Sequence, residues 1–372
     1  MRPIRVLVVD DAVVVRRLFT SALAEDPALE VIGTAANGKI ALAKIAQTPP
    51  DVVTLDVEMP EMDGLETLAA IRKAHPAVRV IMVSSLTERG AAVTIDALAL
   101  GASDYVPKPG KSGGVDDTLR TLREVLIPKI RALGAKAVAA AAPVPARPSP
   151  AAAPAARVGT PGVRVEIVAI GVSTGGPNAL AALLPTFPAD LAAPVLIVQH
   201  MPPLFTRLLA ERLAGRCKLA VAEAVAGEPL LPGKVWIAPG DFHLSIDRGG
   251  GQPRLRTSQE PPENFCRPAV DVLFRSVADV YGRRALAVVL TGMGQDGLRG
   301  CRRVRQAGGQ IVVQDEATSV VWGMPGYVAG EGLADRVLPL EEVGSEIVRR
   351  VQSGQSAPAP RRPAPTQVDG RC

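Results

Sequence analysis

Short apolar runs rich in β-branched residues alternate with helical patterns through residues 1–133, and this alternation limits the possible folds more than any other feature. We predict strands at 4–9, 31–35, 51–56, 79–84 and 103–106. We predict helices at 13–24, 39–46, 65–74, 91–100 and 115–133. Strands separated by helices run parallel, so this part of the chain predicts a (βα)5 sheet covered by helices on both faces.

The same α/β pattern returns after residue 163. We predict strands at 165–170, 195–199, 234–238, 285–290 and 310–314, with a hairpin within 242–256. We predict helices at 177–184, 204–213, 269–280, 295–306 and 340–351. These residues therefore predict a second α/β domain, doubly wound around a mainly parallel sheet.

A segment of biased composition separates the two patterns. Residues 132–156 contain 13 alanines and 5 prolines in 25 positions and no acidic residue. The prolines prevent a continuous helix and favour extended backbone, so 134–162 is predicted to be a spacer. We expect a first domain at 1–125, a helix end and Ala/Pro-rich linker at 126–162, a second domain at 163–351, and a disordered Pro/Arg-rich tail at 352–372.

Polar side chains follow the predicted strands of the first domain. Asp10 and Asp11 end the first strand, Asp56 ends the third, Ser84 ends the fourth, and Lys108 follows the fifth. The carboxyl ends of parallel strands meet at one edge, so these groups should lie together. Three carboxylates there can hold Mg²⁺, which prefers oxygen ligands. The alternative for each carboxylate is a helix cap or a solvated loop position.

The same residues resemble the receiver domains of two-component response regulators. The matching stretches are VLVVDD, TLDVEMPEMDG, VIMVSSLT and GASDYVPKP, and the resemblance covers 1–125. It implies a flavodoxin-like fold, Asp56 as phosphoacceptor and a histidine autokinase as phosphodonor. It also implies a Mg²⁺ site and a switch, with Asp10, Asp11, Asp56 and the Glu58 carbonyl as metal ligands and Ser84, Tyr105 and Lys108 as switch residues. Ser84 stands where many receivers have threonine and keeps the hydroxyl.

A sharp Gly-x-Ser-x-Gly turn is predicted where the first strand of the second domain meets a helix. Gly171 and Gly175 flank Ser173, and Pro177 suits the first turn of the helix. The spacing is that of a nucleophile elbow, although the pattern alone is weak. A phosphate-cradling loop is the alternative, but the Gly-Lys-Ser/Thr ending of a P-loop is missing.

A serine nucleophile needs a base, and the chain has only 3 histidines. His75 lies before a proline between a helix and a strand of the first domain, where we expect it to be solvated. His200 follows an apolar strand, at a position where catalytic groups gather, whereas His243 lies beside the predicted hairpin. His200 is the first choice for the base and His243 the second.

The third member of such a site should be a carboxylate. Asp296 follows the apolar strand 285–290 within a glycine-rich run, at the predicted start of a helix. It could orient His200, or it could only cap that helix. The glycine-flanked backbone at Met293 could donate an amide to an oxyanion.

Six stretches of the second domain resemble the protein-glutamate methylesterases of the CheB family. They are AIGVSTGGPNAL, PVLIVQHMPPLFTRLLAERL, WIAPGDFHL, RPAVDVLFRSVAD, VVLTGMGQDG and VVQDEATSVVWGMP, within 163–340. The resemblance implies Ser173 as nucleophile, His200 as base, Asp296 as orienting acid, and Met293 and Thr174 as oxyanion and accessory residues. It implies phosphorylation-activated demethylation of glutamate methyl esters, and deamidation of glutamines, on chemoreceptors. No cofactor is expected for the esterase step.

Two positions depart from the family pattern. Cys266 stands where the family often has histidine, and Gly326 stands where it usually has arginine. Neither is one of the three triad positions, but both could alter contacts with the substrate.

Composition excludes several function classes. The chain carries a formal net charge of +5, but the excess lies in the linker and the tail, and the folded parts are net negative. The sequence contains few aromatic residues, and it has no helix-turn-helix pattern with a basic recognition helix. We therefore expect no nucleic acid as partner. The 4 cysteines are scattered and no long apolar segment occurs, so we expect a cytoplasmic protein with reduced thiols and no membrane insertion. A monomer is the default expectation, because the sequence leaves the oligomeric state open. A non-enzymatic response regulator that docks to a partner remains the alternative function.

Overall fold

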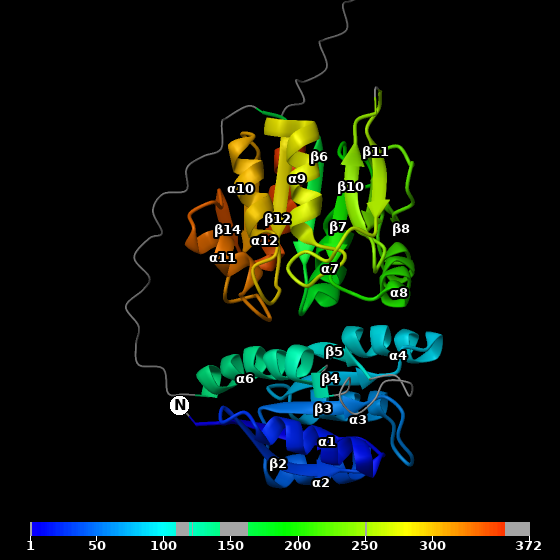
Figure 1. Ribbon diagram of the computed structural model, residues 1–372, viewed down its shortest axis with the longest axis vertical. Helices are drawn as coiled ribbons and strands as arrows, with labels where there is room; N and C mark the ends of the chain where they lie inside the picture. Colours follow the sequence, from blue (N-terminus) through cyan, green and yellow to red (C-terminus); the bar gives the residue numbers. More distant parts are fainter. Residues whose placement is uncertain (1, 109–118, 121, 142–162, 250, 354–372) are drawn as a thin grey trace, which may run out of the picture.

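The computed structural model describes residues 2–108, 119–120, 122–141, 163–249 and 251–353. Figure 1 shows two α/β domains, the first coloured blue to cyan and the second green to red. The predicted linker beyond residue 141 and the predicted tail beyond residue 353 lie outside the described residues.

The first domain is a five-stranded parallel sheet with the order β2-β1-β3-β4-β5. The strands are β1 (Ile4–Val9), β2 (Leu29–Ala35), β3 (Val52–Asp56), β4 (Arg79–Ser84) and β5 (Asp104–Pro107). The helices between them are α1 (Val13–Ala24), α2 (Gly38–Gln47), α3 (Gly64–Ala74) and α4 (Glu88–Ala99). This strand order is that of flavodoxin-like folds, so the predicted fold class is confirmed.

The last helix of this domain is longer than predicted. A short π-helical turn, η1 (Leu122–Leu126), leads into α6 (Ile127–Ala141), which continues eight residues beyond the predicted end at 133. Leu133 is buried, and the Lys136 ammonium donates to the Ser319 carbonyl of the second domain. Residues 134–141 are therefore helical and not a spacer, because alanine is the best helix former and the first proline comes only at 143.

The second domain is built on a seven-stranded parallel sheet with the order β14-β13-β12-β6-β7-β9-β8. Its strands are β6 (Ile167–Val172), β7 (Val195–Gln199), β8 (Ala220–Glu223), β9 (Lys234–Ile237), β12 (Ala285–Val289), β13 (Gln310–Gln314) and β14 (Arg336–Leu338). The predicted hairpin forms from β10 (His243–Asp247) and β11 (Arg254–Ser258), and it ends two residues beyond the predicted range.

Helices cover both faces of this sheet, as predicted. One face packs against α7 (Gly176–Leu183), α8 (Pro203–Ala214) and α12 (Leu340–Gln352), and the other against α9 (Val270–Tyr281), α10 (Leu298–Gln306), α11 (Met324–Gly330) and the hairpin. Successive residues of β6 alternate between the two cores. The prediction missed β8, β14 and α11: the strands are short and partly exposed, and α11 contains two glycines and a proline.

Besides the contact of Lys136 in α6 with Ser319, the two domains contact each other through α4 and β5 of the first and α7 and α8 of the second. The Tyr105 ring stacks on the Phe205 ring with centroids 4.6 Å apart and planes 11° apart. The Asn178 amide donates to the Ala102 carbonyl at 3.2 Å. An Arg207–Glu88 ion pair at 2.7 Å and an Arg212–Asp96 pair lie at the rim, and one apolar cluster continues from domain to domain. Figure 1 shows the first domain facing one end of the second-domain sheet.

Candidate active site

The three candidate catalytic residues of the second domain follow neighbouring strands. Val172 of β6 pairs with Gln199 of β7, so Ser173 and His200 each stand one residue beyond a paired position. Asp296 lies in the loop after β12, which pairs with β6 on its other side. Because later strands are added on both sides of β6, the strand order reverses there, and this is where ligands bind in open α/β sheets.

Ser173 lies on a sharp turn between β6 and α7. Its N–H donates to the Thr291 carbonyl at 3.0 Å, and its carbonyl accepts from the Gly176 N–H at 2.8 Å. Gly175 has φ of 78°, which favours glycine, and a Cβ there would lie 2.6 Å from Val320. Ser173 is half-buried, and within the described residues its hydroxyl has no hydrogen-bond partner. The turn thus presents a side chain that nothing described restrains.

Asp296 is a buried carboxylate surrounded by hydrogen-bond donors. Oδ2 accepts from His200 Nε2 at 2.8 Å and from the Val270 N–H at 2.7 Å. Oδ1 accepts from Asn264 Nδ2, the Asp271 N–H and the Gly297 N–H, at distances from 2.9 to 3.0 Å. Burial alone would raise the pKa of Asp296, but these bonds and the charge of His200 hold the pKa below its usual range.

The alternative that Asp296 only caps its own helix is wrong. The helix α10 begins two residues later and has Gly297 as its N-cap without a side-chain bond. Asp296 instead accepts from the first amides of α9, a different helix. It therefore ties the loop after β12, the start of α9 and the His200 ring together.

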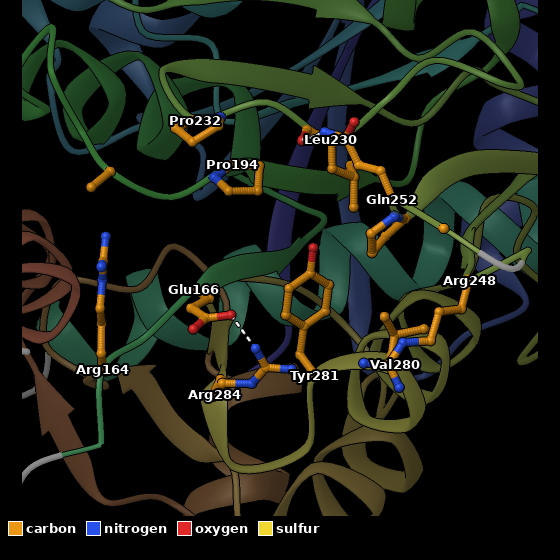
Figure 2. Close-up of a pocket in the computed structure, with 13 residues that line it drawn as sticks. Arg164, Glu166, Pro194, Leu230, Pro232, Arg248, Gln252, Val280, Tyr281 and Arg284 are labelled. Atoms are coloured by element: carbon orange, nitrogen blue, oxygen red, sulfur yellow. Dashed lines mark hydrogen bonds and ion pairs between the residues drawn. The ribbon is translucent and has the colours of Figure 1, made fainter.

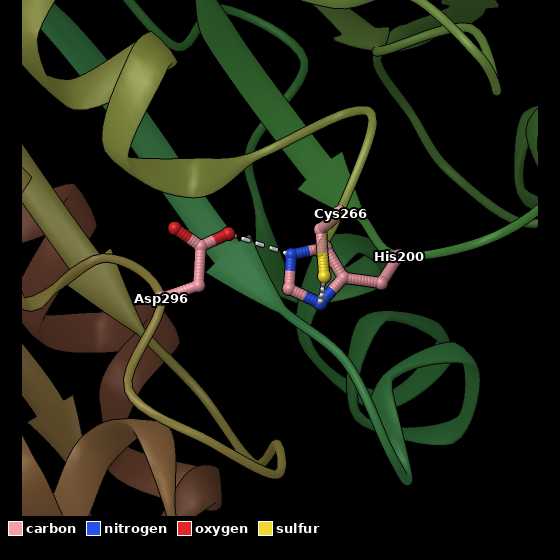
Figure 3. A group of neighbouring side chains, drawn as sticks. All are labelled: His200, Cys266 and Asp296. Atoms are coloured by element: carbon pink, nitrogen blue, oxygen red, sulfur yellow. Dashed lines mark hydrogen bonds and ion pairs between the residues drawn. The ribbon is translucent and has the colours of Figure 1, made fainter. Parts of the chain in front are cut away.

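His200 contacts a different residue at each ring nitrogen, as Figure 3 shows. Nε2 faces Asp296, and Nδ1 lies 3.7 Å from the Cys266 sulfur. The side chain is 13% exposed. Burial lowers the pKa of His200, but Cys266 and Asp296 outweigh it and raise the pKa above its ordinary value. Nδ1 is the nitrogen that Asp296 leaves open.

The other two histidines lie elsewhere. His243 is buried, and both ring nitrogens face backbone: Nε2 lies 3.1 Å from the Pro261 carbonyl, and Nδ1 accepts from the Ala269 N–H at 3.2 Å. His75 ends α3 in the first domain, where its N–H donates to the Ile71 carbonyl. His243 therefore has a structural environment, and His200 alone among the three lies beside a carboxylate.

Met293 and Thr174 lie next to the Ser173 turn. A Cβ on Gly292 would come 2.9 Å from the Ser173 Cβ, so the backbone one residue before Met293 runs against the serine. Gly294, on the other side, has φ of 83°. Thr174 is buried, and its carbonyl accepts from the Thr291 hydroxyl at 2.9 Å.

The two departures from the family pattern both border the site. Cys266 is the residue that faces His200 Nδ1. Gly326 lies in α11 against the Trp322 ring, and a Cβ on Gly326 would stand 3.1 Å from that ring. The exposed Trp322 itself forms a β-bridge with Gly292.

The first domain brings its predicted polar residues together at the carboxyl ends of β1, β3, β4 and β5. Lys108 Nζ lies 2.6 Å from Asp56 Oδ2 and 3.0 Å from Asp10 Oδ2. One oxygen each of Asp10, Asp11 and Asp56 lie within 4.8 Å of one another. Three hard oxygen donors at this spacing fit Mg²⁺, with Lys108 offsetting their charge.

Asp56 is almost fully buried at the end of β3. Burial raises the pKa of Asp56 to about 6, helped by the charge of Asp10 and opposed by Lys108. Glu58 is exposed two residues later, and its N–H lies 3.4 Å from Asp56 Oδ1.

The predicted switch residues connect this edge to the domain contact. The buried Ser84 hydroxyl donates to the Gly90 carbonyl in α4 at 2.9 Å. Tyr105 is buried between Phe205 and Lys129, whose ammonium lies 5.4 Å from the Tyr105 ring centroid. A change in the position of Ser84 or Tyr105 would therefore alter the surface of the first domain that contacts the second domain.

A separate pocket of about 400 Å³ contains none of the candidate residues. It lies where β6, β7 and β12 begin, whereas Ser173 follows the other end of β6. Figure 2 shows residues that line this pocket. Its polar lining residues are Arg164, Glu166, Arg248, Gln252, Tyr281 and Arg284, of which Glu166 and Arg284 form an ion pair.

Sequence reasoning missed the role of Asn264. Its side-chain amide donates to Asp296 Oδ1 at 2.9 Å and to Asp271 Oδ2 at 3.0 Å. Only its position two residues before Cys266 hints at this, because the loop holds no periodic pattern. The neighbourhood of Cys266 and His200 was likewise not foreseen.

Known proteins resemble this chain in both domains. Residues 168–347 match the family model of the CheB methylesterase, and residues 6–120 match that of the response regulator receiver domain. A protein-glutamate methylesterase/protein-glutamine glutaminase of Trichodesmium erythraeum is 52% identical over 353 residues, covering 94% of this chain and 100% of that protein. One from Nocardioides is 52% identical over 363 residues, covering 94% and 96%.

One solved structure is similar to half of this chain. The CheB methylesterase catalytic domain of Thermotoga maritima is 43% identical and covers 50% of this chain and 99% of that one, with a TM-score of 0.49. Within the described residues, every helix is too short or too polar to cross a membrane. Two family models in the predicted order and relatives matched over nearly their whole length place the chain in the CheB family of response-regulator protein-glutamate methylesterases.

Proposed function

We propose that this chain demethylates glutamate methyl esters on methyl-accepting chemoreceptors, and deamidates receptor glutamines, under control of its receiver domain. The activity serves adaptation in chemotaxis-type signalling. The observation that carries the proposal is the His200–Asp296 contact of 2.8 Å beside Ser173, on the neighbouring strand end. The names of the relatives give the substrate class.

The contacts support one assignment of proton transfers. Asp296 holds the hydrogen of His200 on Nε2, so Nδ1 carries the lone pair that accepts the Ser173 proton. The Ser173 oxygen then attacks the ester carbonyl, and the C–O bond to methoxide breaks as the imidazolium returns the proton, releasing methanol. Water, deprotonated by His200, releases the glutamate and restores Ser173. With glutamine, ammonia leaves instead.

Met293 is proposed as an oxyanion donor because its amide follows Gly292, which packs against Ser173. Losing one such donor typically raises the barrier by about 2.7–4 kcal/mol. Thr174 is an accessory residue that fixes the turn through the bond between its carbonyl and Thr291.

In the receiver, Asp56 is the proposed phosphoacceptor and a histidine autokinase the donor. The carboxylates of Asp10, Asp11 and Asp56 and the carbonyl of Glu58 would hold Mg²⁺, which when bound screens charge at this edge. Lys108 is placed to contact the oxygens of a phosphorylated Asp56.

Phosphorylation would control the esterase through the domain contact. Ser84 is bonded to α4, and Tyr105 stacks on Phe205, so both lie between the phosphorylation site and the second domain. For this control, phosphorylation has to favour an arrangement in which the receiver no longer contacts the second domain. The switch residues would supply the difference in free energy between the two arrangements by changing the α4 and β5 surface.

We further propose the domain limits 1–125 for the receiver and 163–351 for the esterase, with a cytoplasmic monomer as the working form. No nucleic-acid partner is proposed, because the folded parts are net negative.

The test is methanol release from membranes that carry methylated chemoreceptors. Intact protein and Ser173→Ala are compared, each with and without acetyl phosphate and Mg²⁺. Release that requires Ser173 and increases with acetyl phosphate supports the whole proposal. Release that ignores acetyl phosphate contradicts the control by the receiver. No release from folded protein on competent receptors favours a non-enzymatic docking protein.

A further inference from the structure

A two-residue turn beside the catalytic residues has an unusual sequence. Glu263 and Cys266 pair through two backbone hydrogen bonds, of 2.9 and 3.1 Å, and enclose Asn264 and Phe265. Both enclosed residues have positive φ, 53° and 63°, as a type I′ turn requires. Such turns favour Asn-Gly, so asparagine is expected at the first position, but phenylalanine stands where glycine is favoured.

Nothing among the described residues accounts for that phenylalanine. A bulky residue with positive φ is strained, and Phe265 gains no packing in return, since its side chain is 103% exposed. No other large hydrophobic side chain in the described residues approaches this exposure. Folding alone would favour glycine at this position, so the aromatic ring points to a role outside the folded chain.

The turn is held firmly while the ring is left free. The Glu263 carboxylate pairs with Arg275 through two bonds of 2.6 and 2.7 Å. Asn264 donates to Asp296, and the Cys266 sulfur faces His200. Three of the four turn residues are thus bound to the surrounding structure, two of them to catalytic residues, so Phe265 is presented at a fixed place beside the reaction centre.

A second exposed aromatic residue, Trp322, lies beside the same site. Of the 11 aromatic residues of the chain, only Phe265, Trp322 and Tyr327 are exposed. Trp322 pairs with Gly292, which packs against Ser173, and Tyr327 lies in α11, the helix that begins two residues after Trp322. Aromatic side chains are the commonest anchors of protein interfaces, because they bury a large area with few rotatable bonds.

We propose that Phe265 is a docking anchor for the protein substrate, where it packs against apolar side chains of the receptor near the methylated glutamate. This inference rests on the proposed function and adds to it a residue that favours a protein substrate over a small ester. On this proposal a receptor contacts the ring when it binds, whereas a free glutamate methyl ester is too small to need that contact. The residue contributes to binding and not to the chemical step.

The experiment compares two substrates. Methanol release is measured from methylated receptor membranes and from N-acetyl-glutamate γ-methyl ester, with the full chain, Phe265→Gly and Phe265→Trp. Val225→Ser is the matched control, because Val225 is exposed and follows β8, away from the site. We expect Phe265→Gly to raise KM for receptors at least fivefold, with kcat and small-ester hydrolysis within twofold of the parent. Phe265→Trp keeps a large aromatic side chain, so its KM for receptors should stay close to that of the parent chain.

Stability gives a second readout. Glycine accepts positive φ without strain, so Phe265→Gly should raise Tm by roughly 2 °C while it weakens receptor turnover. A higher Tm excludes unfolding as the cause of the weaker turnover.

Two results would overturn the inference: an unchanged receptor KM in Phe265→Gly, or an equal loss on both substrates, which would mean that the turn only shapes the reaction centre. Failure of the parent chain on receptors, with the small ester still cleaved, would instead contradict the proposed substrate.

Discussion

Replacing Asp296 by asparagine tests the proposed role of this carboxylate most directly. The side chain keeps its size, but one oxygen becomes an NH₂ group. Every neighbour of the carboxylate is a donor: His200 Nε2 and the Val270 N–H at one oxygen, and Asn264, Asp271 and Gly297 at the other. In either orientation, the NH₂ group of an asparagine would face hydrogen-bond donors. The better orientation places NH₂ towards His200 and Val270, because only two donors lie on that side.

The cost to stability follows from these contacts. The Val270 N–H loses its only acceptor among the described residues, and a buried unpaired donor costs about 1–3 kcal/mol. The three bonds at the other oxygen change from charge-assisted to neutral, which roughly halves their strength. We expect the free energy of unfolding to fall by about 2–4 kcal/mol.

The cost to activity comes from the His200 tautomer. To accept from the new NH₂ group, Nε2 has to lose its hydrogen, which then sits on Nδ1, the nitrogen proposed to receive the Ser173 proton. Loss of the correct tautomer lowers turnover by roughly 10⁴-fold. Because Asp296 helps to raise the pKa of His200, the variant should also shift the acid limb of any residual activity to lower pH.

The assay is methanol release from methylated receptors across pH, paired with urea unfolding of the same samples. Asp279→Asn serves as control, since Asp279 is an exposed carboxylate whose one ion-pair partner among the described residues is Arg303 at the surface. Turnover of Asp296→Asn within tenfold of the parent, or an unchanged unfolding free energy, would refute the reasoning.

The remaining predictions concern the thiol, the domain contact and the receiver. Alkylation of Cys266 by iodoacetamide should stop methanol release by crowding His200 Nδ1, while Cys266→Ala resists the reagent; equal inhibition of both would exclude this thiol as the target. Tyr105→Leu removes a ring stack worth about 0.5–1.5 kcal/mol, so release without acetyl phosphate should rise about 2- to 10-fold if the contact with Phe205 restrains the enzyme. Asp56→Asn should keep basal release and lose the response to acetyl phosphate, and a surviving response would show that another residue accepts the phosphoryl group.

Most of the fold could be predicted because the sheets are parallel and buried. Their strands are continuous apolar runs, and strands such as β1, β7 and β13 begin and end where the sequence predicts. The candidate residues could be found for the same reason, since each follows such a run. The short edge strand β14 and helix α11 lack that pattern, and their place in the structure comes from packing against neighbours.

The contacts within the site could not be predicted in the same way. Asn264 reaches Asp296 across 32 positions of sequence, and Cys266 reaches His200 across 66. Their loop has no periodicity, and its course is set by the Glu263–Arg275 pair and by the start of α9. Only the folded chain brings these groups together.

The bonds of Asp296 have a consequence for how this family can lose its activity. Asp296 joins four segments of the chain, so a mutation there damages folding and chemistry at once, and selection for a stable protein alone would preserve it. The Ser173 hydroxyl has no partner among the described residues, so a change to alanine leaves the fold without an unpaired group. A descendant that abandoned catalysis would therefore drift first at the nucleophile while retaining the acid, and persistence of the aspartate in a relative is no sign that the relative is still an enzyme.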